Sequence, residues 1–255
     1  MNRDRTARLS RRIYQLIRFF VQLFYPKIRL AGTENLPDEP CVIVGNHAKM
    51  NGPIACTLYL PGRHAIWCAG EMMHLREVPD YAFRDFWSHK PRCVRWLYRL
   101  LSYLIAPLSV CVFNNAGCIG VYHDMRIIGT FKETVKALED SANVVVFPEH
   151  AVPHNNIVCE FQDRFIDVAR MYYHRTGKSL CFVPLYVAPR LHTLYFGAPV
   201  RFDDAAPHDR ERERICKELS DRITALARSL PEHTVVPYLN LPKRKYPSNK
   251  EPLYE

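Results

Sequence analysis

The residues best suited to chemistry in this sequence are Asn46 and His47, which directly follow the apolar run 42–45. A neutral imidazole accepts a proton near pH 7, so a histidine can act as a general base towards a hydroxyl group. In α/β sheets, the carboxyl ends of the strands face the crevice in which ligands bind. A histidine at the end of a strand therefore suits catalysis, although a lone histidine at such a place is often structural.

A second apolar run has a similar ending. Residues 144–147 lead directly to Pro148, Glu149 and His150, and His154 follows four residues later. Two strand ends would then present carboxylate and imidazole groups. An ordinary passage from strand to loop, with solvated side chains, predicts the same residue types, so this segment by itself leaves both interpretations open.

The same residues allow a different chemistry. Four of them could together bind the metal ion of a hydrolase: His47, Glu149, His150 and His154. Pro153 disfavours this arrangement, because a proline interrupts the helix that would align histidines four residues apart. No further ligands cluster in the sequence, so a metal-dependent hydrolase is kept only as an alternative.

A sheet must position these groups, and apolar runs of strand length recur along the chain. We expect strands at residues 41–44, 65–69, 118–122, 144–147, 181–187 and 193–196. Apolar residues at helical spacing predict three helical faces, formed by Ile128, Phe131, Val135 and Leu138, by Phe161, Phe165, Val168 and Tyr172, and by Ile215, Leu219, Ile223, Leu226 and Leu230. Strands that alternate with helices predict an α/β fold: a single domain, over residues 28–236, with a mostly parallel central sheet flanked by helices.

An amphipathic N-terminal helix is expected to precede this domain, over residues 1–27. Its apolar residues recur at helical spacing and arginines lie nearby: Leu9, Ile13, Leu16, Phe20 and Leu23 are accompanied by Arg8, Arg11, Arg12 and Arg18. A transmembrane span needs about 20 mostly apolar residues, whereas this segment is shorter and charged. We therefore expect the helix to lie in a membrane interface, with packing on the domain's own core as the alternative. Gln15, Arg18 and Gln22 interrupt the apolar stretch, so a secretory signal is not expected.

The apolar stretch from Trp96 to Phe113 is a second candidate for membrane contact. Arg99 and Pro107 interrupt it, and its charge-free part, 100–113, has only 14 residues. This length argues against a full span and predicts a core helix followed by a buried strand. The last segment, 237–255, carries four prolines among charged residues and is expected to be an irregular tail.

Charge and cysteine content narrow the class of partner and the compartment. The 35 Lys and Arg against 26 Asp and Glu give a formal charge of +9, which suits anionic lipid, nucleic acid or acidic small molecules. Without an aromatic and basic RNA motif or a DNA-reading helix, a nucleic-acid partner is not expected. The nine cysteines are scattered and odd in number, which indicates a reducing compartment and no disulfide framework.

In their order and separation, the segments resemble the glycerolipid acyltransferase family, whose members include lysophosphatidic acid acyltransferases. That family is marked by an Asn-His pair with a following Asp, a Gly-containing strand with an Arg, a Phe-Pro-Glu-Gly motif and an apolar Val-Pro strand. This sequence has Asn46-His47, a loose counterpart of the second motif at 117–124, then Phe147-Pro148-Glu149 and Val183-Pro184. The resemblance covers residues 28–201.

The resemblance implies that His47 is the general base that deprotonates the hydroxyl of a lysophospholipid or related acceptor. The hydroxyl would then attack the thioester of acyl-CoA or acyl-carrier protein, with no cofactor, no metal and no covalent enzyme intermediate. The implied catalytic residues are His47, Glu149 and Asp124, and the implied substrate-binding residues are Asn46, Asn51, Gly52, Phe147, Pro148, His150, His123 and Arg126. The resemblance also implies a peripheral or monotopic protein at the cytoplasmic face of a membrane, with the lipid surface and the acyl donor as partners.

Two departures from the family pattern modify this expectation. The family's Asp would fall at Gly52, so the carboxylate that orients the imidazole is missing there, and in the serine-protease triad a comparable Asp-to-Asn change costs roughly 10⁴ in rate. Asp124 and Glu149 are the candidates for a substitute acid. His150 stands where the family has Gly, and the family's phosphate-binding Arg has no clear counterpart, since His123 occupies its place.

These departures leave two expectations within the resemblance. The first is an acyltransferase with an altered acid or an altered acceptor. The alternative is a relative that binds lipid at a membrane surface without catalysis.

Overall fold

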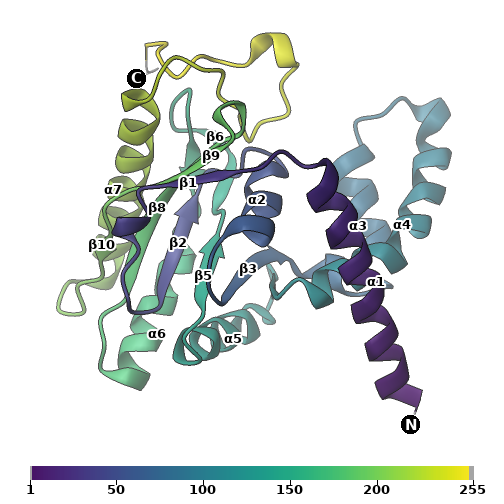
Figure 1. Cartoon of the computed structure of the whole chain (residues 1–255), viewed down its shortest axis with the longest axis horizontal. Helices are drawn as coiled ribbons and strands as arrows, with labels where there is room; N and C mark the ends of the chain where they lie inside the picture. The colour runs from purple at the N-terminus through teal and green to yellow at the C-terminus, as the bar shows by residue number, and fades with distance from the viewer. Residues whose placement is uncertain (1, 253–255) are drawn as a thin grey trace. The chain divides into compact units, whose positions relative to one another are not determined.

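Two apolar strands that are buried along their whole length form the centre of the sheet. β2 (Cys41–Gly45) and β8 (Cys181–Ala188) lie side by side in parallel, with Val42 opposite Phe182. Both strands are rich in β-branched and other apolar residues, as is typical of strands covered on both faces. The computed structural model describes residues 2–252 (Figure 1).

Four further strands extend this sheet around β2 and β8. β5 (Asn143–Val146) pairs in parallel with β2, while β9 (Thr193–Phe196) and β10 (Val200–Arg201) pair antiparallel with β8. β1 (Arg29–Ala31) pairs in parallel with β9. The expected α/β fold with a mostly parallel central sheet is therefore confirmed, and the strand expected at 193–196 has those same bounds.

The contacts of the chain group into two compact units, which are described separately. The larger unit consists of residues 26–64 and 131–255 and holds the strands described above, whereas the smaller unit consists of residues 1–25 and 65–130. The domain boundaries expected after residues 27 and 236 stay predictions. Residue 1 of the expected N-terminal helix and residues 253–255 of the expected tail lie outside the described residues.

Helices flank the sheet of the larger unit. They are α2 (Asn51–Tyr59), the greater part of α5 (Ile127–Glu139), α6 (Asp167–Thr176) and α7 (His208–Ser229). α7 packs against β8 and buries Ile215, Leu219 and Ile223, as their spacing predicts. A two-stranded hairpin, β6 (Glu149–Pro153) with β7 (Cys159–Phe161), follows β5 directly.

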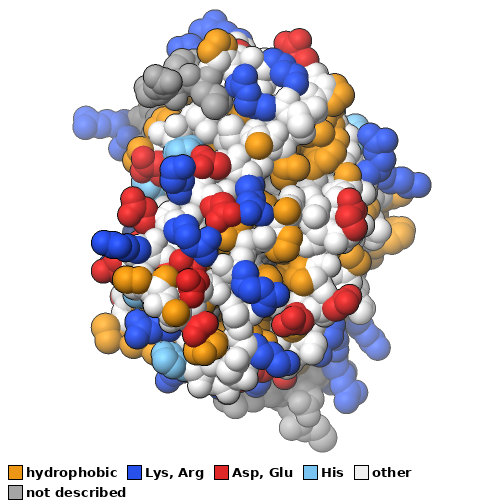
Figure 2. Space-filling model, turned by 90° about the vertical axis from the view of Figure 1, so that its left-hand side faces the viewer, with side chains coloured by type: hydrophobic (Ala, Val, Ile, Leu, Met, Phe, Trp, Pro, Cys, Tyr) orange, Lys and Arg blue, Asp and Glu red, His pale blue; other side chains and the backbone are white. Residues whose placement is uncertain are grey.

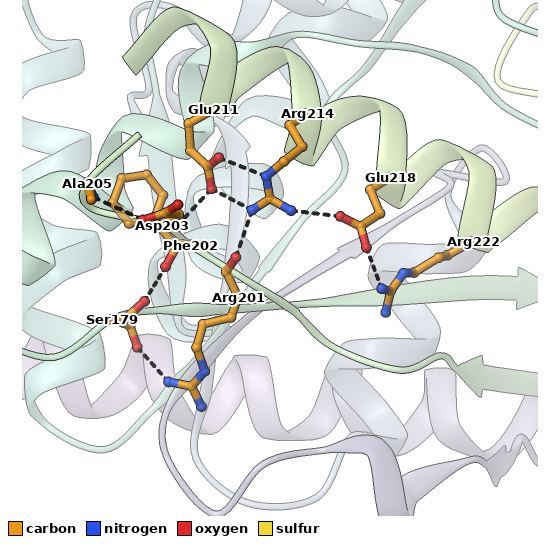
Figure 3. Close-up of polar contacts among 9 residues, drawn as sticks. All are labelled: Ser179, Arg201, Phe202, Asp203, Ala205, Glu211, Arg214, Glu218 and Arg222. Atoms are coloured by element: carbon orange, nitrogen blue, oxygen red, sulfur yellow. Dashed lines mark hydrogen bonds and ion pairs between the residues drawn. The ribbon is translucent and has the colours of Figure 1, made fainter. Parts of the chain in front are cut away.

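α7 carries charges of both signs that pair with one another. Arg214 lies between Glu211 and Glu218, with nitrogen–oxygen distances of 2.5 Å and 2.8 Å, and Glu218 also pairs with Arg222 (Figure 3). Arg214 further donates to the main-chain oxygen of Arg201 in β10. Figure 2 shows acidic and basic side chains interspersed over this side of the molecule. The hydrogen bond to Arg201 ties α7 to the sheet, and the paired charges along the helix offset one another.

The smaller unit combines two parallel strands with long helices. β3 (His64–Ala69) pairs with β4 (Cys118–Val121), and the helices are α1 (Asn2–Phe24), the short α3 (Val78–Ala82) with a π-helical turn after it (Phe83–Trp87), and α4 (Arg95–Asn115). α1 and α4 touch at Ser10, whose hydroxyl accepts a hydrogen bond of 2.9 Å from Asn115. The expected N-terminal helix is therefore present, and it packs on another helix of the same unit.

α4 corrects the expectation of a helix followed by a buried strand at 96–113. The segment is one helix that runs through Pro107. The expectation failed because the periodicity of a short apolar run does not distinguish a strand from a helix. By length and composition alone, residues 92–115 could cross a membrane, and this is the one helix among the described residues that meets that criterion. Its most apolar window has a mean hydropathy of 1.5, and only 17% of that window is buried.

Candidate active site

Asn46 fixes the exit of β2. Its side chain is almost fully buried and forms two hydrogen bonds with the main chain of Val187 in β8: the amide oxygen accepts from the N–H at 2.7 Å and the amide nitrogen donates to the carbonyl at 3.3 Å. The side chain thereby extends the β2–β8 pairing by one residue. Asn46 holds the main chain that presents His47.

A strained turn follows His47. Ala48 and Lys49 have φ angles of 45° and 58°, in the left-handed region that side-chain-bearing residues seldom adopt. The turn closes when the Gly52 N–H donates to the carbonyl of His47 at 3.2 Å, and the Asn51 side chain caps the carbonyl of Ala48 at 2.8 Å. Such strain at a strand end persists only where the surroundings hold it, and it turns the Lys49 carbonyl back towards the preceding histidine.

That carbonyl sets the tautomer of His47. Nδ1 of the imidazole contacts the main-chain oxygen of Lys49. A carbonyl only accepts hydrogen bonds, so Nδ1 carries the proton and Nε2 keeps its lone pair. Burial lowers the pKa of His47, because the charged imidazolium loses hydration there. The ring is thus neutral at pH 7 and has one nitrogen ready to accept a proton.

Gly52 has no room for a side chain. A Cβ atom at this position would lie 2.7 Å from Cε1 of Phe147 and 2.8 Å from the main-chain oxygen of His47. The Phe147 ring also lies beside the imidazole, with the two ring centroids 5.3 Å apart. The aromatic ring therefore occupies the space in which an aspartate at position 52 would begin.

Glu149 joins three segments at the base of the site. Its carboxylate accepts hydrogen bonds from the main-chain N–H of His47 at 2.5 Å and of Cys159 at 2.9 Å. The side chain is only 4% exposed, and burial raises the pKa of its carboxyl group to about 7. Glu149 thus contacts the main chain of His47, while the Lys49 carbonyl contacts the ring.

The hairpin after Glu149 holds the other residues of that motif. Pro148 is buried, and its carbonyl accepts from the N–H of Gln162 at 2.9 Å. His150 lies 3.5 Å from the carboxylate of Glu160 in β7, and His154 is exposed at the turn. Within residues 2–252, no three or more His, Cys, Asp or Glu side chains gather closely enough to hold a metal ion. The metal-hydrolase alternative therefore gains no support from the arrangement of these side chains.

Asp124 and Arg126 pair with each other in the smaller unit. Arg126 lies 2.9 Å from Asp124 and 3.1 Å from Glu77, and its guanidinium stacks on the ring of Tyr122 at 4.0 Å. Hydrogen bonds from Arg126 lower the pKa of the Asp124 carboxyl group. His123, next to this group, is exposed. The side chains proposed as substitute acid and as phosphate ligand are therefore engaged with one another.

Two tyrosines of the expected tail complete the site, although they were not among the residues expected there. The ring of Tyr238 lies 5.7 Å from that of His47, and Nζ of Lys49 lies 5.2 Å above the ring of Tyr246. In its described part, up to residue 252, this segment is irregular apart from a short helical turn (Lys243–Lys245) and the bridge residue Ser248. Aromatic residues between prolines were the one available signal that this segment packs on the domain.

Comparison with known proteins adds one finding. No family model matches the sequence, and no curated protein matches it. Among solved structures, the 1-acyl-sn-glycerophosphate acyltransferase PlsC from Thermotoga maritima is similar with a TM-score of 0.44 and 16% sequence identity, over 87% of this chain and 83% of that chain. A likeness at this level carries no argument about activity, which has to come from the residues described above.

Proposed function

We propose that the protein is an acyltransferase that moves a fatty acyl group from a thioester donor to the hydroxyl of a lysophospholipid or related acceptor. The observation that carries the proposal is the state of His47: a neutral, half-buried imidazole at a strand end, with Nδ1 bonded to the Lys49 carbonyl and Nε2 as proton acceptor. The resemblance of Asn46-His47 and Phe147-Pro148-Glu149 to the motifs of glycerolipid acyltransferases supports the same reaction.

The reaction can be written with these groups alone. Nε2 of His47 takes the proton of the acceptor hydroxyl while its oxygen attacks the carbonyl carbon of the thioester. The carbon–sulfur bond then breaks, and the departing thiolate recovers the proton from the imidazolium. The donor is acyl-CoA or acyl-carrier protein, and no bond to the enzyme forms.

The Lys49 carbonyl would replace the family's aspartate in one of its two roles. It orients the imidazole and fixes the tautomer, as a carboxylate does. It carries no full charge, so it stabilises the imidazolium less than a carboxylate would. Glu149 would act one step away, by holding the main-chain N–H of His47.

The membrane side of the proposal draws on α1 and α4. Both helices leave large apolar side chains in solvent, including Phe24, which is 81% exposed, and Trp96, which is 69% exposed. Arginines accompany the apolar residues of α1, as in helices that lie in the headgroup region of a membrane. We propose a peripheral or monotopic association with the cytoplasmic face of a membrane.

An acyl-transfer assay with matched histidine variants tests the proposal. Purified protein is given long-chain acyl-CoA or acyl-carrier protein with a panel of lysophospholipids and glycerol phosphate, and thiol release and lipid products are measured. His47→Ala is expected to lower the rate by about 10²–10⁴-fold, the usual contribution of a general base. His154→Ala, at an exposed histidine of the same unit, should leave the rate unchanged. Unreduced transfer by His47→Ala would contradict the proposal.

The second candidate function is lipid binding at a membrane surface without catalysis. It is favoured by the crowding at Gly52, which excludes the family's carboxylate. Liposome binding without turnover for any donor and acceptor pair would support this candidate.

A further inference from the structure

The segment 236–246, which we call the C-terminal strap, is a loop closed at its neck. Thr234 and Ser248 form an isolated antiparallel bridge, and the N–H of Val235 donates to the carbonyl of Pro247 at 2.9 Å. The two sides of the neck therefore hold the ends of the strap together, so that the strap can be considered as one element.

The neck is anchored to the domain through Asn249. This side chain is fully buried and donates to the carbonyl of Ala227 in α7 at 2.7 Å, while its amide oxygen accepts from the N–H of His233 at 2.8 Å. The ring of His233 lies in turn 2.8 Å from the hydroxyl of Tyr186 in β8. The anchor fixes where the strap begins and ends relative to the sheet.

The underside of the strap faces the candidate active site. Tyr238 packs against the ring of His47, and Tyr246 lies under the ammonium group of Lys49. A cation above an aromatic face is held more weakly than one in a charge-assisted hydrogen bond. An anion could therefore readily recruit the ammonium group of Lys49, which lies two residues along the chain from the candidate base.

The strap adds positive charge without any compensating acid. Residues 234–249 contain Lys243, Arg244 and Lys245 but no Asp or Glu. All three side chains are exposed, and among residues 2–252 no carboxylate lies within ion-pair distance of them or of Lys49. Arg214 and Arg222 on α7 differ in this respect, because each pairs with an acid of the same helix.

We propose that Lys49 and the C-terminal strap form a binding site for a phosphate group next to His47. The site would take either the phosphate of an acceptor molecule or the phosphate of a lipid headgroup, since the chemistry of recognition is the same for both. Phosphate binding requires no acyl transfer, so the inference goes beyond the proposed function and can be tested without turnover.

Charge-matched variants test the site. One triple variant changes Lys243, Arg244 and Lys245 to Gln, and a control triple variant changes Lys178, Arg190 and Arg210, exposed cations of the same unit, to Gln. Both lose the same net charge, so a difference between them reports the location of binding and not the overall charge. Lys49→Met, with Lys49→Arg as its conservative partner, tests the residue next to the base.

Two probes distinguish the sources of phosphate. The soluble probe is sn-glycerol 3-phosphate, followed through the ring-proton chemical shifts of His47. The membrane probe is flotation with phosphatidylcholine vesicles that contain phosphatidylglycerol. Each basic residue near an anionic surface contributes about fivefold in binding, so the strap triple should lose on the order of a hundredfold on the vesicles.

The outcomes separate cleanly. If Lys49→Met abolishes the chemical-shift change caused by glycerol phosphate and Lys49→Arg retains it, the site binds the phosphate of an acceptor. If the strap triple variant loses only vesicle binding, the site binds the phosphate of a lipid headgroup. Either result supports the site. Equal losses in the strap and control triples, or no loss with either probe, would overturn it. Failure of acyl transfer would leave these binding results unchanged.

Discussion

Two strand ends of this protein carry clusters of polar residues, and they differ in what their charged groups contact. At the end of β2, His47 and Glu149 are tied to main-chain atoms, and one imidazole nitrogen keeps its lone pair. After β4, Asp124 and Arg126 form an exposed ion pair with each other, next to His123. Both clusters have the residue types expected of an active site.

The difference indicates which cluster can do chemistry. A solvent-exposed group that already pairs with a group of opposite charge has little tendency to change its protonation state. Buried groups bonded to the main chain instead have pKa values displaced towards their neutral form, as at many functional sites. His47 and Glu149 both meet this description.

The largest expected effect comes from Glu149→Ala. This change leaves the buried N–H groups of His47 and Cys159 without their acceptor, which should lower the free energy of unfolding by about 2–5 kcal/mol. Urea unfolding measures the loss. Asp124→Ala, at the exposed pair, should cost far less, because solvent screens that pair. Equal costs at the two strand ends would remove the distinction between them.

The pH dependence of stability should follow Glu149. Its carboxyl group has a pKa of about 7 when folded and near 4.5 when unfolded, so the folded chain binds the extra proton between these values. Its contribution to the free energy of unfolding is complete below about pH 4.5. This contribution, about 3 kcal/mol, is lost as the pH rises through 7.

Glu149→Gln isolates this contribution, because the titration of His47 is common to both proteins. The free energy of unfolding of the wild type minus that of the variant, from urea unfolding at several pH values, should fall between pH 4.5 and 7.5. A flat difference would show that the carboxyl group is not desolvated as described.

A smaller effect is expected from a pair of glycine substitutions. Gly52→Ala forces a methyl group against the Phe147 ring and the His47 carbonyl, and should cost about 1–3 kcal/mol. Gly129→Ala, in α5 with open space around it, should instead stabilise by about 0.5–1 kcal/mol. Thermal unfolding of both variants gives the comparison, and a tolerated Gly52→Ala would mean that position 52 can accept a side chain.

The smallest effect should follow Arg126→Gln. This arginine is exposed and shared between two surface acids, so its loss should leave the free energy of unfolding nearly unchanged. Acyl transfer, measured with the same acceptor panel, should change by less than about twofold if the cluster after β4 is structural. A large rise in KM for phosphate-bearing acceptors would make that cluster part of the site.

The sequence predicted those parts of the fold that repeat along the chain. Strands and helices follow from local periodicity, and the strand bounds at 193–196 were predicted correctly. α4 was partly missed because apolar residues that face solvent on a helix give the same local signal as buried ones. Local patterns report which residues are apolar, but they do not report what covers them.

The candidate site depended on features that local patterns do not contain. The main-chain oxygen of Lys49 has no residue-type signature, since its position results from two left-handed residues in succession. The contact of Phe147 with Gly52 joins residues 95 positions apart. Tyr238 lies beside His47 in a strap whose neck is anchored to α7 by the buried Asn249.

The position of that neck has a consequence for the order in which the protein matures during synthesis. Every strand of the sheet leaves the ribosome before Asn249, so the nascent chain can build its core while His47 is still uncovered. Domains generally fold as units while synthesis proceeds from the N-terminus. The cover over the imidazole would thus be the last part of the site to assemble, and a bulky reporter fused close after residue 249 would disturb it without disturbing the sheet.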